Sequence, residues 1–178
     1  VHLDEFENEN LTPEKTASVM LEVARKRIRI ARRMGANAVC SESPVGDVLA
    51  ADNTVLIVEP DDAGAKMLED SLKSRGMIVS RRSDGISALE LIRRDRPAAV
   101  ISEVIMPRLD GFELRERLLE IPELSPIPFI LISHRRDDAS LTRAHSLGIA
   151  HFLKKPYSIT ELTGITRIAI ENYVRACS

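Results

Sequence analysis

The sequence has few aromatic residues and few cysteines. It contains no tryptophan, and aromatic residues make up only 3% of its 178 residues, which argues against a nucleic-acid binder that stacks bases on aromatic rings. Its two cysteines, Cys40 and Cys177, are too few for a disulfide framework or a zinc site, and we expect free thiols in a reducing cytoplasm. Apolar runs such as residues 129–132 are too short to span a bilayer, and the sequence shows no secretory signal pattern.

Charge is unevenly distributed, although the net charge is only −2. Residues 1–13 carry four acidic residues and no basic one, and residues 14–33 carry seven basic against two acidic residues. Residues 34–53 carry three acidic residues, and residues 54–178 balance 18 of each sign. One basic segment therefore lies between two acidic ones in a chain that is not basic enough overall to bind polyanions.

Residues 1–35 are predicted to form an acidic tail followed by a basic amphipathic helix. Thr12, Pro13 and Glu14 are typical of a helix start, and apolar residues then recur at alternating spacings of four and three: Ala17, Leu21, Ala24, Ile28 and Ala31. An isolated helix of this length is marginal in water, so its apolar stripe needs cover from the rest of the chain, from a second copy or from a partner. Nucleic-acid and membrane-surface binding are weaker alternatives. Residues 36–53 are predicted to be a linker.

From residue 54 onward, short apolar runs alternate with helical periodicity. Strands are predicted at 55–58, 77–79, 98–102, 127–132 and 150–153, and helices at 62–75, 84–94, 110–119, 137–147 and 158–175. Five such units predict an α/β domain over residues 54–178, with helices on both faces of a parallel sheet. Its length suits a five-stranded, doubly wound, flavodoxin-like sheet of order 2-1-3-4-5, whose ligand site lies at the carboxyl ends of the strands.

Polar side chains follow four of the five predicted strands. Acidic residues follow the first and third, a hydroxyl and an imidazole follow the fourth, and a lysine follows the fifth: Glu59, Asp61, Asp62, Glu103, Ser133, His134 and Lys155. Carboxylates suit a hard divalent cation, and a hydroxyl with an ammonium suits phosphate oxygens. Loops at strand ends are polar in any case, so this pattern alone leaves a simple solvated edge open.

Four motifs in order make the pattern specific. They are VLIVEPDD (55–62), MPRLDG (106–111), PFILIS (128–133) and KP (155–156). With these motifs, residues 54–175 resemble a response-regulator receiver domain of bacterial two-component signalling and phosphorelays. The resemblance says nothing about residues 1–53.

The resemblance implies roles for individual residues. An acid pair after the first strand would hold Mg²⁺ together with the backbone carbonyl of Ile105, and the residue at position 103 would accept phosphate from a histidine kinase. Ser133 and Lys155 would bind the phosphoryl oxygens, and Phe152 would be the aromatic residue that changes rotamer in the switch. The output surface would be the fourth helix, fifth strand and fifth helix of the domain, near Arg143, His151, Phe152 and Tyr157.

Three departures from the family pattern fall on this one pocket. The acceptor position holds Glu103 instead of Asp, Pro60 replaces the metal-binding acid, and His134 replaces a small residue. Each departure has an innocent reading, since Glu103 could simply pair with Lys155 and His134 could face solvent. Together they favour a degenerate receiver, or pseudo-receiver, with no metal site unless Asp61 or Asp62 completes one.

The sequence therefore predicts a cytoplasmic signalling protein that is not an enzyme and acts through protein–protein contacts. It would be unphosphorylated because Glu103 replaces the acceptor Asp, would need no cofactor, and would bind another signalling protein through the output surface. Two alternatives stay open. One is a conventional phospho-switch with a reshaped acidic site, and the other is a nucleic-acid-binding regulator that uses the basic N-terminal helix.

Overall fold

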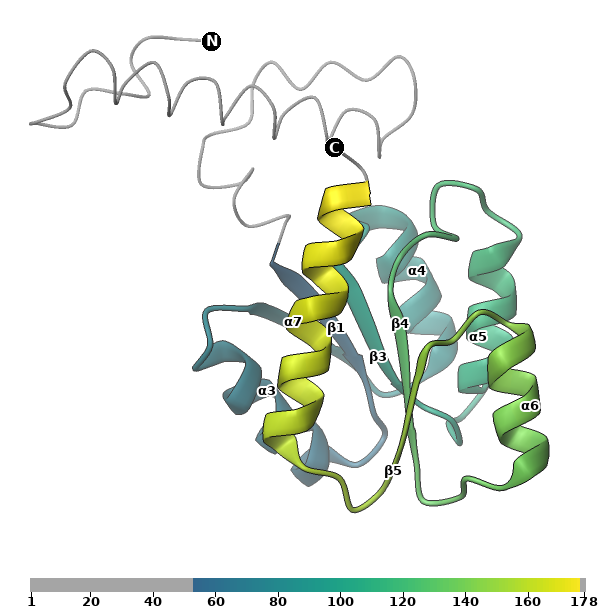
Figure 1. The fold of residues 1–178 in the computed structure, drawn as a ribbon, viewed down its shortest axis with the longest axis horizontal. Helices are drawn as coiled ribbons and strands as arrows, with labels where there is room; N and C mark the ends of the chain where they lie inside the picture. Colours follow the sequence, from purple (N-terminus) through teal and green to yellow (C-terminus); the bar gives the residue numbers. More distant parts are fainter. Residues whose placement is uncertain (1–52, 177–178) are drawn as a thin grey trace, which may run out of the picture.

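The computed structural model describes residues 53–176, so the predictions for residues 1–52 lie outside the part described. Five strands alternate with five helices (Figure 1). The strands are β1 (Thr54–Val58), β2 (Ile78–Arg82), β3 (Ala99–Glu103), β4 (Phe129–Ser133) and β5 (His151–Lys154). The helices are α3 (Asp62–Lys73), α4 (Gly85–Asp95), α5 (Gly111–Leu119), α6 (Asp138–Ser146) and α7 (Ile159–Ala176).

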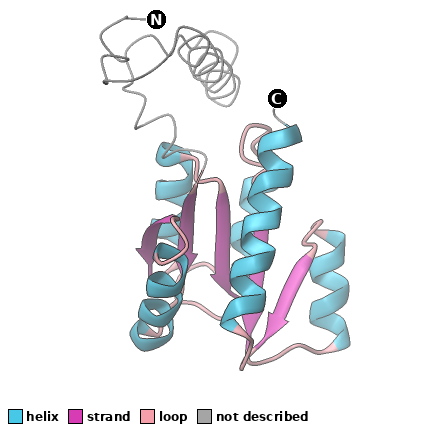
Figure 2. Ribbon diagram, turned by 60° about the vertical axis from the view of Figure 1, so that its left-hand side comes forward, coloured by secondary structure: helices cyan, strands magenta, loops and turns pink. Residues whose placement is uncertain are grey.

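All strand pairs are parallel, and the strand order is β2-β1-β3-β4-β5, which confirms the predicted fold. Helices α3 and α7 cover one face of the sheet, and α4, α5 and α6 cover the other (Figures 1 and 2). The apolar runs of β1, β3 and β4 are buried because they face helices on both sides. Within residues 53–176, no helix is long and apolar enough to cross a membrane.

Four helices begin at the carboxyl edge of the sheet with the same local device. Asp61, Asp84, Asp110 and Asp137 are the N-cap residues of α3, α4, α5 and α6, and each side chain accepts a backbone N–H of the first turn. This contact satisfies a helix-end donor that would otherwise lack a partner. The caps fix where the loops at this edge end, and these loops carry the predicted site.

Two details of the prediction are wrong. The second strand was expected at 77–79 but runs from Ile78 to Arg82, because an edge strand is half solvated and tolerates Ser80, Arg81 and Arg82. The spacing of Ile86, Leu89 and Ile92 over residues 84–94 predicts that these three are buried, but Ile86 is 40% exposed, and Ala88 and Leu91 are buried beside Ile92. The pattern of large apolar residues misled the prediction because it gave no weight to the small alanine.

Candidate functional site

The carboxyl edge of the sheet brings four predicted side chains together. Glu59 follows β1 directly, Glu103 and Ser133 are the last residues of β3 and β4, and Lys155 follows β5. The β3 end also needs a close approach by the backbone of α5. A Cβ atom on Gly111 would lie 2.4 Å from the carbonyl oxygen of Glu103, so only glycine fits in the MPRLDG motif.

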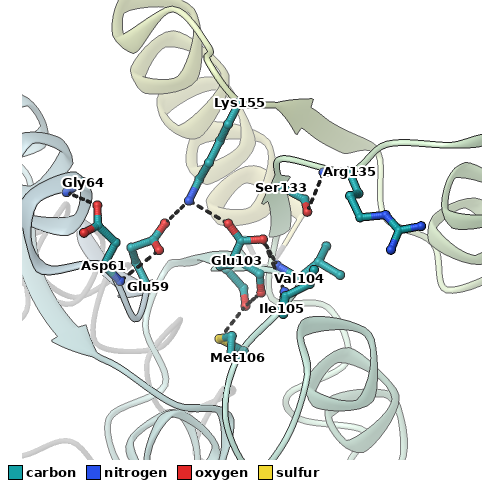
Figure 3. A network of polar contacts seen from close by, with 11 residues as sticks. Glu59, Asp61, Gly64, Glu103, Val104, Ile105, Met106, Ser133, Arg135 and Lys155 are labelled. Atoms are coloured by element: carbon teal, nitrogen blue, oxygen red, sulfur yellow. Dashed lines mark hydrogen bonds and ion pairs between the residues drawn. The ribbon is translucent and has the colours of Figure 1, made fainter.

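Lys155 lies between two buried carboxylates (Figure 3). Its Nζ is 2.5 Å from Glu59 Oε2 and 2.6 Å from Glu103 Oε2, and each glutamate is only 5% exposed. Burial alone would lower the pKa of Lys155, but hydrogen bonds and charges from Glu103 and Glu59 outweigh it and raise the pKa above its usual value. The ammonium is therefore held charged, and it is shared by two acids.

The second oxygen of each glutamate is held by the backbone. Glu103 Oε1 accepts the N–H of Val104 at 2.8 Å and that of Ile105 at 3.3 Å, and Glu59 Oε1 accepts the N–H of Asp61 at 3.2 Å. Charge-assisted bonds of this kind are stronger than neutral ones. Both carboxylates are therefore fixed at both ends, by Lys155 on one side and by loop amides on the other.

The other two predicted acids are turned to different partners. Asp61 Oδ2 accepts the N–H of Gly64 at 2.8 Å as the N-cap of α3. Asp62 Oδ1 forms an ion pair with Arg81 Nη2 at 2.7 Å, across to β2. The structure thus brings Glu59 and Glu103 to Lys155, and it does not bring the carboxylate of Asp62 there.

Ser133 and His134 differ in their surroundings. The Ser133 side chain is buried, its Oγ accepts the N–H of Arg135 at 3.2 Å, and its carbonyl oxygen accepts the N–H of Lys155 at 2.8 Å. His134 is exposed at the rim of the site. The β4 end therefore positions the lysine backbone, and His134 lines the cavity from an exposed position.

A cavity of about 550 Å³ opens above the ion pairs. Glu59, Glu103, Ser133, His134 and Lys155 line it, together with Met67, which the sequence did not indicate, and with Ile105 and Tyr157, which the resemblance placed in other roles. Met67 is 56% exposed and Ile105 is 63% exposed, which gives a charged floor an apolar rim. Tyr157 was expected near the output surface; here it lines the cavity, and its pKa is raised, chiefly by burial.

Phe152 is buried against the second helical layer. Its ring meets the ring of Phe112 edge to face, with centroids 6.1 Å apart, and the guanidinium of Arg136 lies 5.9 Å from the Phe152 centroid. Arg143, expected near the same surface, is an exposed residue of α6, lies over the Phe112 ring at 4.7 Å and pairs with Glu116. Tyr157 lines the cavity above Lys155. His151, the fourth predicted output residue, is the half-buried first residue of β5.

The donor set at this edge does not fit the Mg²⁺ ion that the resemblance implies. Magnesium needs near-octahedral oxygen ligands. Here Glu59 and Glu103 are engaged by Lys155, position 60 has no carboxylate, and Asp61 caps α3. Within residues 53–176, no group of three or more His, Cys, Asp or Glu side chains is arranged to hold a metal ion.

Comparison with known proteins gives a consistent result. Residues 55–167 match the family model described as the response regulator receiver domain. Response regulator MprA of Mycobacterium leprae (strain TN) is 33% identical over 108 residues, which cover 61% of this chain and 46% of that protein. The chain thus spans about half the length of the curated relatives it matches.

Solved structures show the same similarity. The signal receiver domain of a histidine kinase from Syntrophus aciditrophicus is 28% identical, with a TM-score of 0.63 over 67% of this chain and 91% of that one. The receiver domain of the Francisella response regulator 1452 is 25% identical, also with a TM-score of 0.63, over 67% of this chain and 98% of that one.

Proposed function

The chain belongs to the response regulator receiver domain family of two-component signalling, and from that premise we propose that it is a pseudo-receiver that signals by protein–protein contact without being phosphorylated. One observation carries the proposal: the Glu103 carboxylate already occupies Lys155 at 2.6 Å. In the family pattern, an aspartate stands at this position and Lys155 is the ligand of a phosphoryl group.

The longer side chain of Glu103 is the reason that position 103 does not accept a phosphoryl group in this proposal. Its extra methylene carries the carboxylate to the ammonium of Lys155 and to the N–H groups of Val104 and Ile105. A phosphoryl group on this carboxylate would have to displace charge-assisted hydrogen bonds in a buried site. The built-in anion thus stands where a transferred one would need to bind.

Loss of the metal ligand acts in the same direction. Phosphoryl transfer depends on a cation that neutralises the charge developing on the transferred group. Pro60 supplies no ligand, and Asp61 and Asp62 hold the α3 N-terminus and Arg81 instead. These contacts support a pocket that keeps one conformational state. The proposed protein is therefore a cytoplasmic phosphorelay component that binds no cofactor and catalyses no reaction.

The surface that signals is proposed to be α6, β5 and α7. Phe152 connects this surface to the interior through Phe112, and its ring is buried and contacted from two sides. With the pocket fixed, this surface presents one shape to a partner signalling protein. Control would then come from what covers the surface, and phosphate would play no part in it.

The test is intact-mass measurement after incubation of the full chain with acetyl phosphate and Mg²⁺. A conventional receiver in the same tube shows that the donor is active. The expected result is an unchanged mass for this protein while the conventional receiver gains one phosphoryl group. An adduct on the unmodified chain would support the alternative of a phospho-switch with a reshaped acidic site and would refute the proposal.

A further inference from the structure

The cavity above the ion pairs is large enough for an organic molecule. Its volume of about 550 Å³ falls within the roughly 300–1,000 Å³ that is typical of small-molecule sites in proteins. Under the proposed function neither phosphate nor Mg²⁺ binds there, because Glu103 already holds Lys155 at 2.6 Å. The residues that line the cavity therefore indicate which other kind of ligand it suits.

Apolar side chains form much of the cavity wall. Met67, Ile105 and Tyr157 line it together with Pro60 and Pro156. Met67 is 56% exposed and Ile105 is 63% exposed, so a ligand with an apolar body would remove apolar surface from water, which is favourable. A thioether makes favourable contacts with aromatic rings, and a tyrosine ring attracts cations over its face. The wall therefore suits a ligand with an apolar, aromatic body.

Acidic side chains outnumber basic ones around the cavity. Glu59, Asp61 and Glu103 line it, and Lys155 is the one lysine or arginine that lines it within residues 53–176. Lys155 pairs with both glutamates, whereas Asp61 forms no ion pair in that part of the chain and accepts the backbone N–H of Gly64. A site with this surplus of carboxylates attracts a cation and repels an anion.

Ser133 supplies a buried hydrogen-bond donor to the same cavity. Its side chain is 1% exposed and lines the cavity. The Oγ atom accepts the N–H of Arg135 at 3.2 Å, but the hydroxyl donates its own hydrogen to no acceptor within residues 53–176. A buried donor is costly to leave unpaired, so an acceptor oxygen on a ligand would be favoured here. Figure 3 shows Glu59 and Asp61 on one side of the Lys155 ammonium and Ser133 on the other.

We propose that this cavity binds a small organic ammonium compound with an apolar body and one uncharged acceptor oxygen. The ammonium lies beside the carboxylate of Asp61, and the acceptor oxygen receives the hydrogen of the Ser133 hydroxyl. The apolar body between them lies against Met67 and Tyr157. The inference rests on the proposed function, because a pocket that took up Mg²⁺ and a phosphoryl group would hold those groups in the same space.

Four related probes separate the contributions of the ammonium and the oxygen. Phenylalanine amide carries both groups, 2-phenylethylamine carries only the ammonium, 3-phenylpropionamide carries only the amide carbonyl, and 3-phenylpropionate carries a negative charge instead. Each is titrated into the isotope-labelled full chain at about pH 7, where α-amino groups are mostly protonated, and the backbone amide shifts in NMR spectra give its dissociation constant. We expect shifts at Gly64, Ile105 and Arg135. Phenylalanine amide should bind tightest, each probe with one group about fivefold more weakly, and the anion most weakly.

Two substitutions test the two contacts separately. Asp61→Asn removes the charge while asparagine remains a good N-cap for α3, so it should weaken phenylalanine amide about fivefold and leave 3-phenylpropionamide unchanged. The matched control is Asp62→Asn, because the carboxylate of Asp62 pairs with Arg81, and it should change neither. Ser133→Ala should weaken both probes that carry a carbonyl about fivefold and leave 2-phenylethylamine unchanged. A variant that failed to fold would lose all probes alike and could not mimic these patterns.

The inference would be overturned if phenylalanine amide did not bind saturably or if 3-phenylpropionate bound as tightly. Amide shifts confined to residues outside the cavity would overturn it too, as would losses in the variants that do not follow the ammonium and the carbonyl. The acetyl phosphate experiment reads the proposed function separately. An unchanged mass without probe binding defeats only this inference, whereas a phosphoryl adduct counts against the proposed function and removes the premise of this one.

Discussion

Lys155 Nζ lies 2.6 Å from Glu103 Oε2, at a point where neither side chain is more than 14% exposed. The glutamate is the last residue of β3, and the lysine follows β5, so the pair ties together strands that are separated by β4. A second carboxylate, Glu59, contacts the same ammonium from β1. The cluster therefore places two carboxylates around one ammonium at the centre of the sheet edge.

Restoring phosphorylation should need more than one substitution. Glu103→Asp alone should give no phosphoryl adduct with acetyl phosphate and Mg²⁺, because position 60 still lacks a metal-binding carboxylate and the bulkier His134 still lines the cavity in place of a small residue. Pro60→Asp, Glu103→Asp and His134→Ala together should give an adduct, since the metal can then neutralise the transferred charge. Intact-mass measurement reads both outcomes.

The matched control for the triple variant carries Pro60→Ala in place of Pro60→Asp. It removes the proline without adding a carboxylate and should stay unmodified. An adduct of high yield on Glu103→Asp alone would mean that Asp61 or Asp62 completes a metal site after leaving its present partner, Gly64 or Arg81.

The two members of the ion pair should differ sharply in their effect on stability. Lys155→Met leaves two buried carboxylates without a cation and should lower the free energy of unfolding by about 3–5 kcal/mol. Glu103→Gln leaves Lys155 paired one to one with Glu59 and should change it by less than about 1 kcal/mol. Urea unfolding measures both.

Lys154→Met is the control, because this neighbouring lysine is exposed and its loss should cost no more than about 0.5 kcal/mol. If Glu103→Gln were as damaging as Lys155→Met, the surplus negative charge would be neutralised by something other than Lys155.

The carboxyl edge of the sheet shows which features of the fold and the site the sequence predicts. The strands followed from continuous apolar runs that alternate with helices, as in a parallel sheet covered on both faces. Their order followed from a domain length that suits a five-stranded, doubly wound sheet. The order of motifs placed Glu59, Glu103, Ser133 and Lys155 at one edge. The sequence did not indicate the partner of each acid. Asp61 accepts the backbone N–H of Gly64, and Asp62 pairs with Arg81, and these partners depend on how the chain turns into α3.

The sequence pattern also did not predict which apolar residues are exposed. Met67 and Ile105 are residue types usually found in the core, yet both are exposed at the cavity rim. Arg115 shows the opposite case: a charged residue that is buried under the α5–β4 loop. Burial in these cases depends on which side of a loop or helix faces its neighbour in space, and local periodicity does not contain that information.

The pH dependence of the ion pair should appear only at alkaline pH. The pKa of Lys155 is raised in the folded protein, so its stabilisation is fully present below the unfolded lysine pKa of about 10.4 and is lost as pH rises through the folded value. The difference in unfolding free energy between the unmodified protein and Lys155→Met should therefore be flat from about pH 7 to about pH 10 and then shrink. A difference that shrinks near neutrality would contradict the charged, shared ammonium.

Arg115 should be essential for the packing of α5 although it meets no carboxylate within residues 53–176. Its guanidinium donates to the carbonyl oxygens of Leu147, Ser125 and Ile127 at 3.3, 3.1 and 3.4 Å, and it is only 7% exposed. Arg115→Met would leave these acceptors without their donor and should cost about 2–4 kcal/mol, since each buried polar group left unsatisfied costs roughly 1–3 kcal/mol. Arg117→Met, two residues along the same helix and exposed, is the matched control and should cost no more than about 0.5 kcal/mol.

The final prediction concerns the ring that the family pattern associates with switching. Phe152 and Phe112 meet edge to face at 6.1 Å, and such pairs contribute about 0.5–1.5 kcal/mol beyond the area they bury. Either substitution by alanine should cost about 3–5 kcal/mol through the cavity it leaves. The double variant should cost less than the sum, by about 1 kcal/mol, because the second change removes a contact already lost. Strictly additive costs would show that Phe152 spends much of its time away from Phe112, which a domain held in one state does not allow.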